Sequence, residues 1–107
     1  MTATWVLTSD ELSSGLRSSL RAMLDDAFDG EFSDEDWAHT VGGWHVVVMA
    51  GDRPIAHGAV AARDLEVDGV PFHAGYVEAV ATRPSDQRRG LGSAVMRRLA
   101  TVIGEHF

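Results

Sequence analysis

The chain has 107 residues, enough for one domain with a modest core, and it has no Cys, which excludes disulfides, thiolate metal sites and cysteine nucleophiles. Its formal net charge of −7 opposes nucleic-acid binding and suits a cationic ligand better. Because it has neither a secretory signal nor a long apolar span, we expect a cytoplasmic protein that does not engage membranes. The five His show no metal-site spacing, so we expect solvated or core histidines and no bound metal.

The N-terminal part of the chain predicts a strand followed by a helix. Residues 5–7 form a short apolar run, and Thr8-x-x-Glu11 is a capping box that should start the helix. We expect this helix to end near Gly30. Its predicted apolar face consists of Leu12, Leu16, Leu20, Met23, Leu24 and Ala27.

An acidic segment follows. It contains Asp25, Asp26, Asp29, Glu31, Asp34, Glu35 and Asp36. Because Phe32 and Trp37 interleave these acids with apolar side chains, we expect part of the segment to pack and to aim its carboxylates; a solvated helix end is the alternative. Ser33-x-x-Asp36 predicts the cap of a second, shorter helix that stops at Gly42-Gly43.

Three antiparallel strands are predicted next. Residues 44–49 form a nearly unbroken apolar run, and further strands are expected over about 55–67 and 70–82. The pair Asp68-Gly69 between the last two is a strong hairpin signal.

The segment Gln87–Gly92 lies between the last predicted strand and an amphipathic helix. The apolar face of that helix contains Leu91, Val95, Leu99, Val102 and Ile103. Gly90 and Gly92 let the backbone approach a ligand closely, and the free amides of a helix N-terminus attract anions. We therefore predict a pyrophosphate site, with a structural turn or a site for another anion as the alternatives. A dinucleotide fingerprint is excluded because Val95 stands where its third glycine would be.

The pattern Gln/Arg-x-x-Gly-x-Gly after a strand resembles the acyl-coenzyme-A (CoA) loop of the GNAT (Gcn5-related N-acetyltransferase) superfamily, and residues 87–92 match its three fixed positions. The predicted order of strand, two helices, three antiparallel strands, loop and helix is also that of the first half of this α+β fold. The resemblance implies acetyl-CoA as the co-substrate. Because members of the superfamily need further strands after the loop helix, we expect residues 1–107 to be a single GNAT domain, truncated after that helix.

Three further blocks look like the aminoglycoside 2'-N-acetyltransferases, namely Asp29–His45, Ile55–His57 and Gly75–Ala81. They are more specific than the loop, which only places a protein in the superfamily. The resemblance implies direct transfer of acetyl from acetyl-CoA to the 2'-amino group of an antibiotic in a ternary complex, and hence antibiotic resistance. It also implies that the tyrosine proposed as general acid lies outside these residues.

Glu78 is the candidate general base, because acetyl transfer needs a neutral amine and a substrate ammonium must first lose a proton. Strand alternation predicts one shared face for Tyr76, Glu78, Val80 and Thr82. We expect apolar neighbours to desolvate the Glu78 carboxylate, which favours proton uptake; a salt bridge to Arg63 or Arg83 is the alternative. In the family that the blocks resemble, this strand position contacts the drug and is proposed as the remote base.

The resemblance also implies a role for the backbone that follows Glu78. The Val80 amide is expected to polarise the thioester carbonyl as an oxyanion hole, with Val80, Ala81 and Thr82 along the pantetheine arm. The expected pyrophosphate-binding residues are Gln87, Arg88, Arg89, Gly90, Leu91 and Gly92. Whether the two arginine side chains face ligand or solvent is left open by the pattern.

The substrate side is expected to be acidic, because charge-assisted bonds to carboxylates hold a polycationic antibiotic efficiently. Glu31 and Asp36 are the candidates, together with Glu78 and its neighbour Ala79. In the family the acid before the Phe-x-x-x-Asp-Trp stretch contacts the antibiotic, which places Glu31 there. For Asp36, helix capping is the stronger interpretation.

Two other functions stay open. One is a non-catalytic fragment that binds CoA or associates with another chain, a homodimer included, because part of the active site is expected elsewhere. The other is a GNAT enzyme that acts on a different amine, such as a polyamine or a protein N-terminus.

Overall fold

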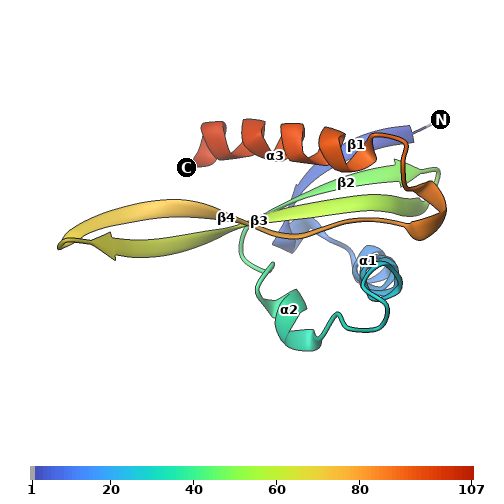
Figure 1. The fold of residues 1–107 in the computed structure, drawn as a ribbon, viewed down its shortest axis with the longest axis horizontal. Helices are drawn as coiled ribbons and strands as arrows, with labels where there is room; N and C mark the ends of the chain where they lie inside the picture. Colours follow the sequence, from blue (N-terminus) through green and yellow to red (C-terminus); the bar gives the residue numbers. More distant parts are fainter. Residues whose placement is uncertain (1) are drawn as a thin grey trace.

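The computed structural model describes residues 2–107 and contains one antiparallel sheet whose strand order in space follows the chain (Figure 1). The strands are β1 (Thr2–Thr8), β2 (Trp44–Ala50), β3 (Arg53–Val67) and β4 (Val70–Thr82). The α-helices are α1 (Ser14–Ala27), α2 (Asp34–Ala38) and α3 (Leu91–His106). The predicted order of elements is confirmed, and no helix within residues 2–107 is long and apolar enough to span a membrane.

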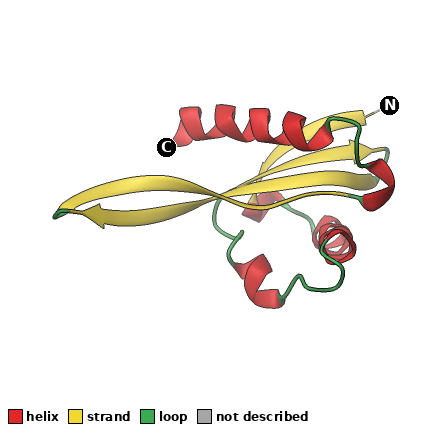
Figure 2. Cartoon of the chain, viewed as in Figure 1, coloured by secondary structure: helices red, strands yellow, loops and turns green. Residues whose placement is uncertain are grey.

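The sheet lies between two helical layers, with α3 on one face and α1 and α2 on the other (Figure 2). On the first face, α3 packs on Val46 and Val48 of β2 through Val95, Leu99 and Val102. On the second face, α1 packs on Val47 and Met49 through Leu20, Met23 and Leu24. Both faces of β2 are therefore covered, which explains why this strand is an unbroken apolar run in the sequence.

The β3–β4 hairpin extends beyond the helices as an arm (Figure 1). Asp68 and Gly69 have φ of 50° and 78°, the left-handed values that a two-residue type I′ turn requires. The predicted bounds of β4 are confirmed, and β3 begins only two residues before the expected Ile55. In the sheet order β4 is one of the two edge strands, so one side of its backbone has no neighbouring strand within residues 2–107.

The start of the first helix differs from the prediction. The Glu11 carboxylate accepts hydrogen bonds from the Thr8 N–H at 2.8 Å and the Thr8 hydroxyl at 3.0 Å, but the element they cap is a short 3-10 helix over Ser9–Glu11. The chain then extends through the buried Leu12, and α1 begins afresh after Ser13, whose hydroxyl accepts from a helix amide. The Ser9 N–H donates to the carbonyl of Gly43, the residue before β2, and this bond ties the 3-10 helix to the end of the sheet.

Strand β4 contains a β-bulge at Ala79. This residue has φ of 52°, and the pairing with β3 shifts here, so that Ala79 and Val80 together oppose the single residue Gly58. A bulge inverts the alternation of side chains. The predicted shared face of Glu78 and Val80 is therefore wrong: Val80 packs on the α3 side, whereas Glu78 faces α1 and α2.

Candidate active site

Two neighbouring clefts lie along β4 on either side of the bulge. The first, which we call the acidic cleft, has a volume of about 280 Å³ and is lined by Phe28, Glu31, Phe32, Asp36, Glu78 and Ala79. The second, which we call the loop cleft, has a volume of about 340 Å³ and is lined by Ala27, Phe28, Val80, Ala81, Thr82, Gln87 and Gly92. They share Phe28 and divide between Ala79 and Val80. The bulge thus lies at the boundary between the two clefts.

The acidic cleft brings together the residues that the sequence assigns to the substrate side. Glu31 and Asp36 come from the segment around the start of α2, while Glu78 and Ala79 come from β4. A larger hollow of about 420 Å³ at the other end of the sheet, bordered by residues such as Trp44 and His106, contains none of the predicted site residues. We therefore place the candidate site at the bulge, beside the cleft that the predicted substrate-side residues line.

Glu78 is not enclosed by apolar neighbours as expected. Its side chain is 29% exposed, and the Arg63 guanidinium lies 3.8 Å from its carboxylate, which is the alternative that the sequence left open. The same guanidinium stacks 5.8 Å from the centre of the Tyr76 ring. The bulge explains the difference, because it turns the carboxylate out of the sheet toward the acidic cleft. There it is accessible to a cationic ligand.

The acidic segment packs as expected, through aromatic side chains. Phe28 and Phe32 stack with ring centres 5.6 Å apart, and Trp37 packs against the α1 cluster. Asp36 has two roles: its carboxylate accepts from the Ser33 N–H at 2.9 Å and it also lines the cleft. These hydrogen bonds from Ser33 lower the pKa of Asp36, so the cap keeps a negative charge at the cleft wall.

The predicted pyrophosphate loop leads directly into α3. Gly90 is the N-cap with φ of 75°, and Arg88 also has a left-handed φ of 65°. The helix begins at Leu91, so its first amides lie at the end of the loop cleft that Gln87 and Gly92 line. This arrangement agrees with an anion site at a helix N-terminus.

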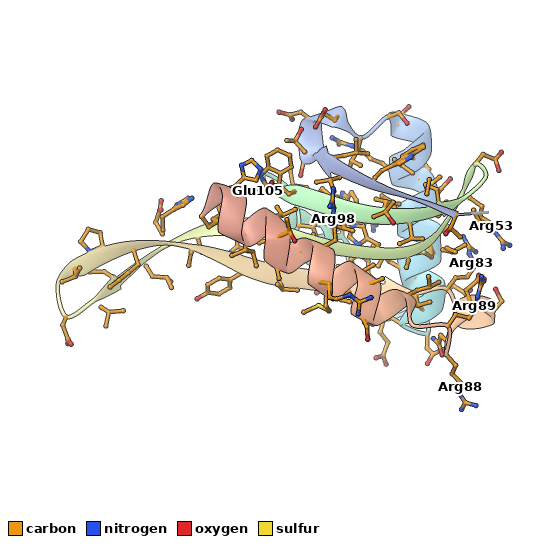
Figure 3. The ribbon with its side chains drawn as sticks, turned by 90° about the horizontal axis from the view of Figure 1, so that it is seen from above. Arg53, Arg83, Arg88, Arg89, Arg98 and Glu105 are labelled. Carbon is orange, nitrogen blue, oxygen red and sulfur yellow. The ribbon has the colours of Figure 1, made fainter. Side chains whose placement is uncertain are left out.

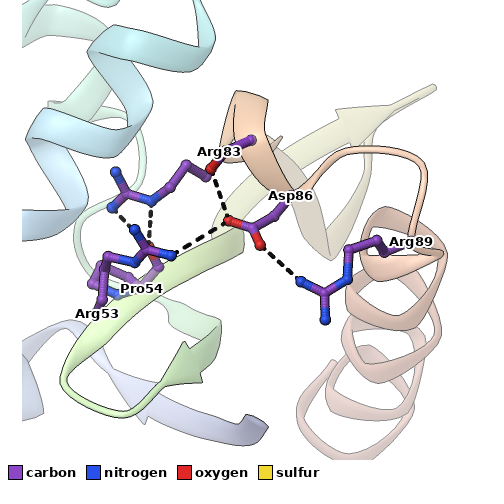
Figure 4. Close-up of polar contacts among 6 residues, drawn as sticks. Arg53, Pro54, Arg83, Asp86 and Arg89 are labelled. Carbon is purple, nitrogen blue, oxygen red and sulfur yellow. Dashed lines mark hydrogen bonds and ion pairs between the residues drawn. The ribbon is translucent and has the colours of Figure 1, made fainter. Parts of the chain in front are cut away.

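Neither arginine of the loop turns into the cleft. Arg88 points away from the body of the protein (Figure 3), and the Arg89 guanidinium donates to the Asp86 carboxylate at 2.8 Å (Figure 4). Arg53 also lies near this carboxylate, at 3.9 Å. Sequence reasoning missed the buried Asp86, although its position three residues before Arg89 was a usable signal.

We expect Asp86→Ala to loosen the loop, because Asp86 is the buried acceptor that fixes Arg89. Since the arginine is itself largely exposed, the expected loss of stability is modest, about 1 kcal/mol, but CoA affinity should fall severalfold. Calorimetry with CoA and thermal unfolding measure the two effects. Unchanged affinity would show that the ion pair does not order the loop.

Two fully buried histidines connect Ser9 to the bulge through a chain of hydrogen bonds. The Oγ of Ser9 lies 2.8 Å from Nε2 of His45, Nδ1 of His45 lies 2.9 Å from Nε2 of His57, and Nδ1 of His57 lies 2.9 Å from the Ala79 carbonyl oxygen. Burial lowers the pKa of His57 to about 4, and burial together with the nearby His57 lowers that of His45 to about 3. Core histidines were expected, but not this chain of hydrogen bonds. Within residues 2–107 no three metal-ligating side chains converge.

We expect the protein to lose stability as the pH falls from about 6.5 toward 4. In that window the histidines of the unfolded chain, with their ordinary pKa of 6.5, bind protons that the buried His45 and His57 of the folded chain do not. The free energy of unfolding therefore decreases as the pH is lowered. The pair should cost about 4 kcal/mol between pH 7 and pH 5. The lowered pKa values of Glu11 and Asp36 act only below pH 4.5. Urea unfolding at several pH values measures the slope, and a flat profile would contradict two neutral histidines.

Comparisons with known proteins identify the family. Residues 8–105 match the family described as "Acetyltransferase (GNAT) domain". The aminoglycoside 2'-N-acetyltransferase of Mycolicibacterium fortuitum is 42% identical over 102 residues, which are 95% of this chain and 52% of that protein. ElaA of Escherichia coli matches in structure with a TM-score of 0.79 at 17% identity, over 100% of this chain and 72% of its own. An aminoglycoside acetyltransferase from an uncultured soil metagenomic sample, solved with sisomicin, gives 0.70 at 13% identity, over 97% and 70%.

The two structural likenesses show the fold, and the α+β architecture predicted from the sequence is confirmed. The chain spans about half the length of the curated relative it matches. The family match extends over all elements from the end of β1 to the last turn of α3. The chain therefore belongs to the GNAT acetyltransferase domain family.

Proposed function

We propose that this chain carries the acetyl-CoA site and part of the antibiotic site of an aminoglycoside N-acetyltransferase that modifies the 2'-amino group of its substrate. The observation that carries this proposal is the meeting of the acidic cleft and the loop cleft at the bulge. A donor held in one and a cationic acceptor held in the other would bring thioester and amine together. The curated relative with 42% identity supports the substrate class.

On the donor side, acetyl-CoA lies in the loop cleft with its pyrophosphate at the N-terminus of α3. The residues of this site are Gln87, Arg88, Arg89, Gly90, Leu91 and Gly92, which we propose act mainly through their backbone. The pantetheine arm follows Val80, Ala81 and Thr82 along β4. The Val80 amide polarises the thioester carbonyl and stabilises the oxyanion that forms on it.

On the acceptor side, Glu31, Asp36 and Glu78 hold the ammonium groups of the antibiotic beside Ala79. The substrate competes with Arg63 for the Glu78 carboxylate. Glu78 takes a proton from the 2'-ammonium group, directly or through a water molecule. The freed nitrogen lone pair attacks the thioester carbon, the C–S bond breaks, and the leaving CoA thiolate takes up the second proton, which the nitrogen loses as the amide forms.

The proposed substrate is tested by measuring thiol release from acetyl-CoA with two aminoglycosides that differ at one position. An antibiotic with a 2'-amino group should support release, whereas its 2'-hydroxy counterpart should support little or none. Equal rates with both would refute the 2' assignment. Release with a polyamine or a peptide N-terminus alone would replace the aminoglycoside with another amine.

A second candidate function is binding of CoA without turnover, favoured by the loop cleft and the first amides of α3, which form the proposed CoA site without the acidic cleft. In that case calorimetry would detect CoA binding while thiol release stays at background. Adding the second half of the relative, in trans or covalently, should then restore turnover.

Glu31→Gln should weaken antibiotic binding without unfolding the chain, because Glu31 is exposed at the cleft wall. We expect KM for the aminoglycoside to rise about tenfold, the loss of one charge-assisted bond, with kcat nearly unchanged. Asp36→Asn should raise KM as well but also lower the melting temperature, since it weakens the cap at Ser33. A Glu31 variant with unchanged KM would remove this residue from the substrate site.

A further inference from the structure

The chain of hydrogen bonds from Ser9 to the bulge has one consistent direction. The Ala79 carbonyl can only accept, so Nδ1 of His57 must carry its hydrogen. In a neutral imidazole Nε2 then accepts, which places a hydrogen on Nδ1 of His45 and leaves Nε2 of His45 to accept from the Ser9 hydroxyl. That hydroxyl accepts in turn from the Gly42 N–H at 3.0 Å.

The far end of the chain is fixed by its own contacts. The Arg17 guanidinium donates to the Ser9 carbonyl at 2.9 Å, and the Ser9 N–H donates to the Gly43 carbonyl at 3.1 Å. These bonds tie the Ser9 backbone to α1 and to the residue before β2, while the Gly42 N–H and the His45 ring hold its hydroxyl. The hydroxyl is a fixed starting point for the two histidine rings.

The other end of this chain of hydrogen bonds is the carbonyl of Ala79, the residue at the bulge. Ala79 has a left-handed φ of 52°, a conformation that is strained for any residue other than glycine. Its position in the bulge removes it from the ladder with β3, so His57 supplies the partner that its carbonyl has in place of a ladder bond. On one side of Ala79 stands Glu78 in the acidic cleft, and on the other stands Val80 in the loop cleft.

We propose that His57, supported by His45 and Ser9, is a positioning residue for acetyl transfer: by holding the Ala79 carbonyl it maintains the bulge that presents Glu78 to the acceptor and Val80 to the thioester. The proposal rests on the proposed function, which gives these two residues their roles. None of the three supporting residues lines either cleft, so they act through Ala79 and not by contact with substrate.

The test compares two substitutions of His57 in the 107-residue chain by NMR and calorimetry. His57→Leu removes the donor, and we expect the Ala79 backbone shifts and coupling constant to lose their left-handed values and acetyl-CoA affinity to fall about tenfold, the equivalent of one lost hydrogen bond. His57→Gln retains an N–H donor and should keep both nearly unchanged. Unaltered Ala79 signals and affinity in folded His57→Leu would overturn the proposal.

Glycine at position 79 provides the sharpest check, because it adopts a left-handed φ without strain. Added to His57→Leu, Ala79→Gly should restore most of the acetyl-CoA affinity, whereas a purely structural defect in the core would not be repaired. Val102→Ala, a buried truncation in the α3 cluster, is the matched control for lost stability and should leave the Ala79 signals in place. Failure of Ala79→Gly to rescue would contradict the positioning role.

Two measurements keep the outcome clear when a variant fails to fold. In the unsubstituted chain, imidazole nitrogen shifts should show both histidines in the Nδ1–H form from pH 6 to 8, and an Nε2–H form of either would overturn the chain of hydrogen bonds. Ser9→Ala, a milder change, should shift the His57 ring signals and lower acetyl-CoA affinity about twofold to threefold. Absence of thiol release would refute only the proposed function, since the Ala79 signals need no substrate.

Discussion

Glu78→Gln is expected to lower the rate of acetyl transfer about 100-fold at pH 7, within the range that general-base catalysis contributes. Glutamine keeps the size of the side chain at the wall of the acidic cleft but cannot take a proton from the ammonium group. The deficit should shrink to about tenfold or less near pH 9.5, because alkaline solution deprotonates the amine unaided. The measurement is the pH profile of kcat/KM for both proteins.

The matched control for this substitution is Glu66→Gln, which removes the same charge from the exposed arm of β3. Its pH profile should follow that of the unsubstituted protein. Arg63→Met distinguishes loss of the ion pair from loss of the base, since it removes the partner of the Glu78 carboxylate and leaves the carboxylate in place. Parallel pH profiles for Glu78→Gln and the unsubstituted protein would exclude Glu78 as the base.

The second large effect is expected at Gly92. A Cβ there would meet only the Thr82 Oγ1, at 4.0 Å, so Gly92→Val should fold. The added side chain would project toward the loop cleft that Gly92 lines and prevent the close approach of a pyrophosphate. We expect CoA affinity to fall by at least 100-fold, measured by calorimetry, with the unfolding transition nearly unchanged.

Gly104→Val is the control for this experiment. Gly104 lies in the same helix, also has open space around its Cβ position, and is far along α3 from the loop. It should bind CoA normally while carrying the same cost of a β-branched residue in a helix. Gly90 is a poorer test site, since its φ of 75° strains any other residue. Normal CoA binding by folded Gly92→Val would contradict the assignment of this loop as a pyrophosphate site.

The hairpin and the last helix could be predicted closely from the sequence because each has a local cause. Asp68-Gly69 fixes a two-residue turn and thereby the pairing of β3 with β4. Apolar residues at helical spacing place α3, and the predicted residues Val95, Leu99 and Val102 are all buried. Ser33 and Asp36 cap α2 reciprocally, as their spacing indicates.

The bulge could not be predicted, because it depends on contacts across three strands and a 3-10 helix and not on local propensity. Nothing about alanine at position 79 indicates a left-handed conformation, which the His57 ring stabilises from β3. The error on the faces of β4 follows from this one extra residue, which inverts the alternation. The start of the first helix was predicted wrongly from Thr8 and Glu11 for a similar reason. Burial of Leu12 and hydrogen bonding to the end of the sheet limit the element that they cap to a short 3-10 helix.

The division of the site at the bulge is tested most directly by titrating the isotopically labelled chain with CoA and with a 2'-amino aminoglycoside in separate NMR experiments. CoA should shift the amides of Gly90, Gly92 and Val80, whereas the antibiotic should shift those of Glu31 and Glu78, with Ala79 responding to both. Both ligands perturbing one common surface, or the hollow beside Trp44 and His106 responding in place of the bulge, would contradict the assignment of donor and acceptor to two clefts that meet at Ala79.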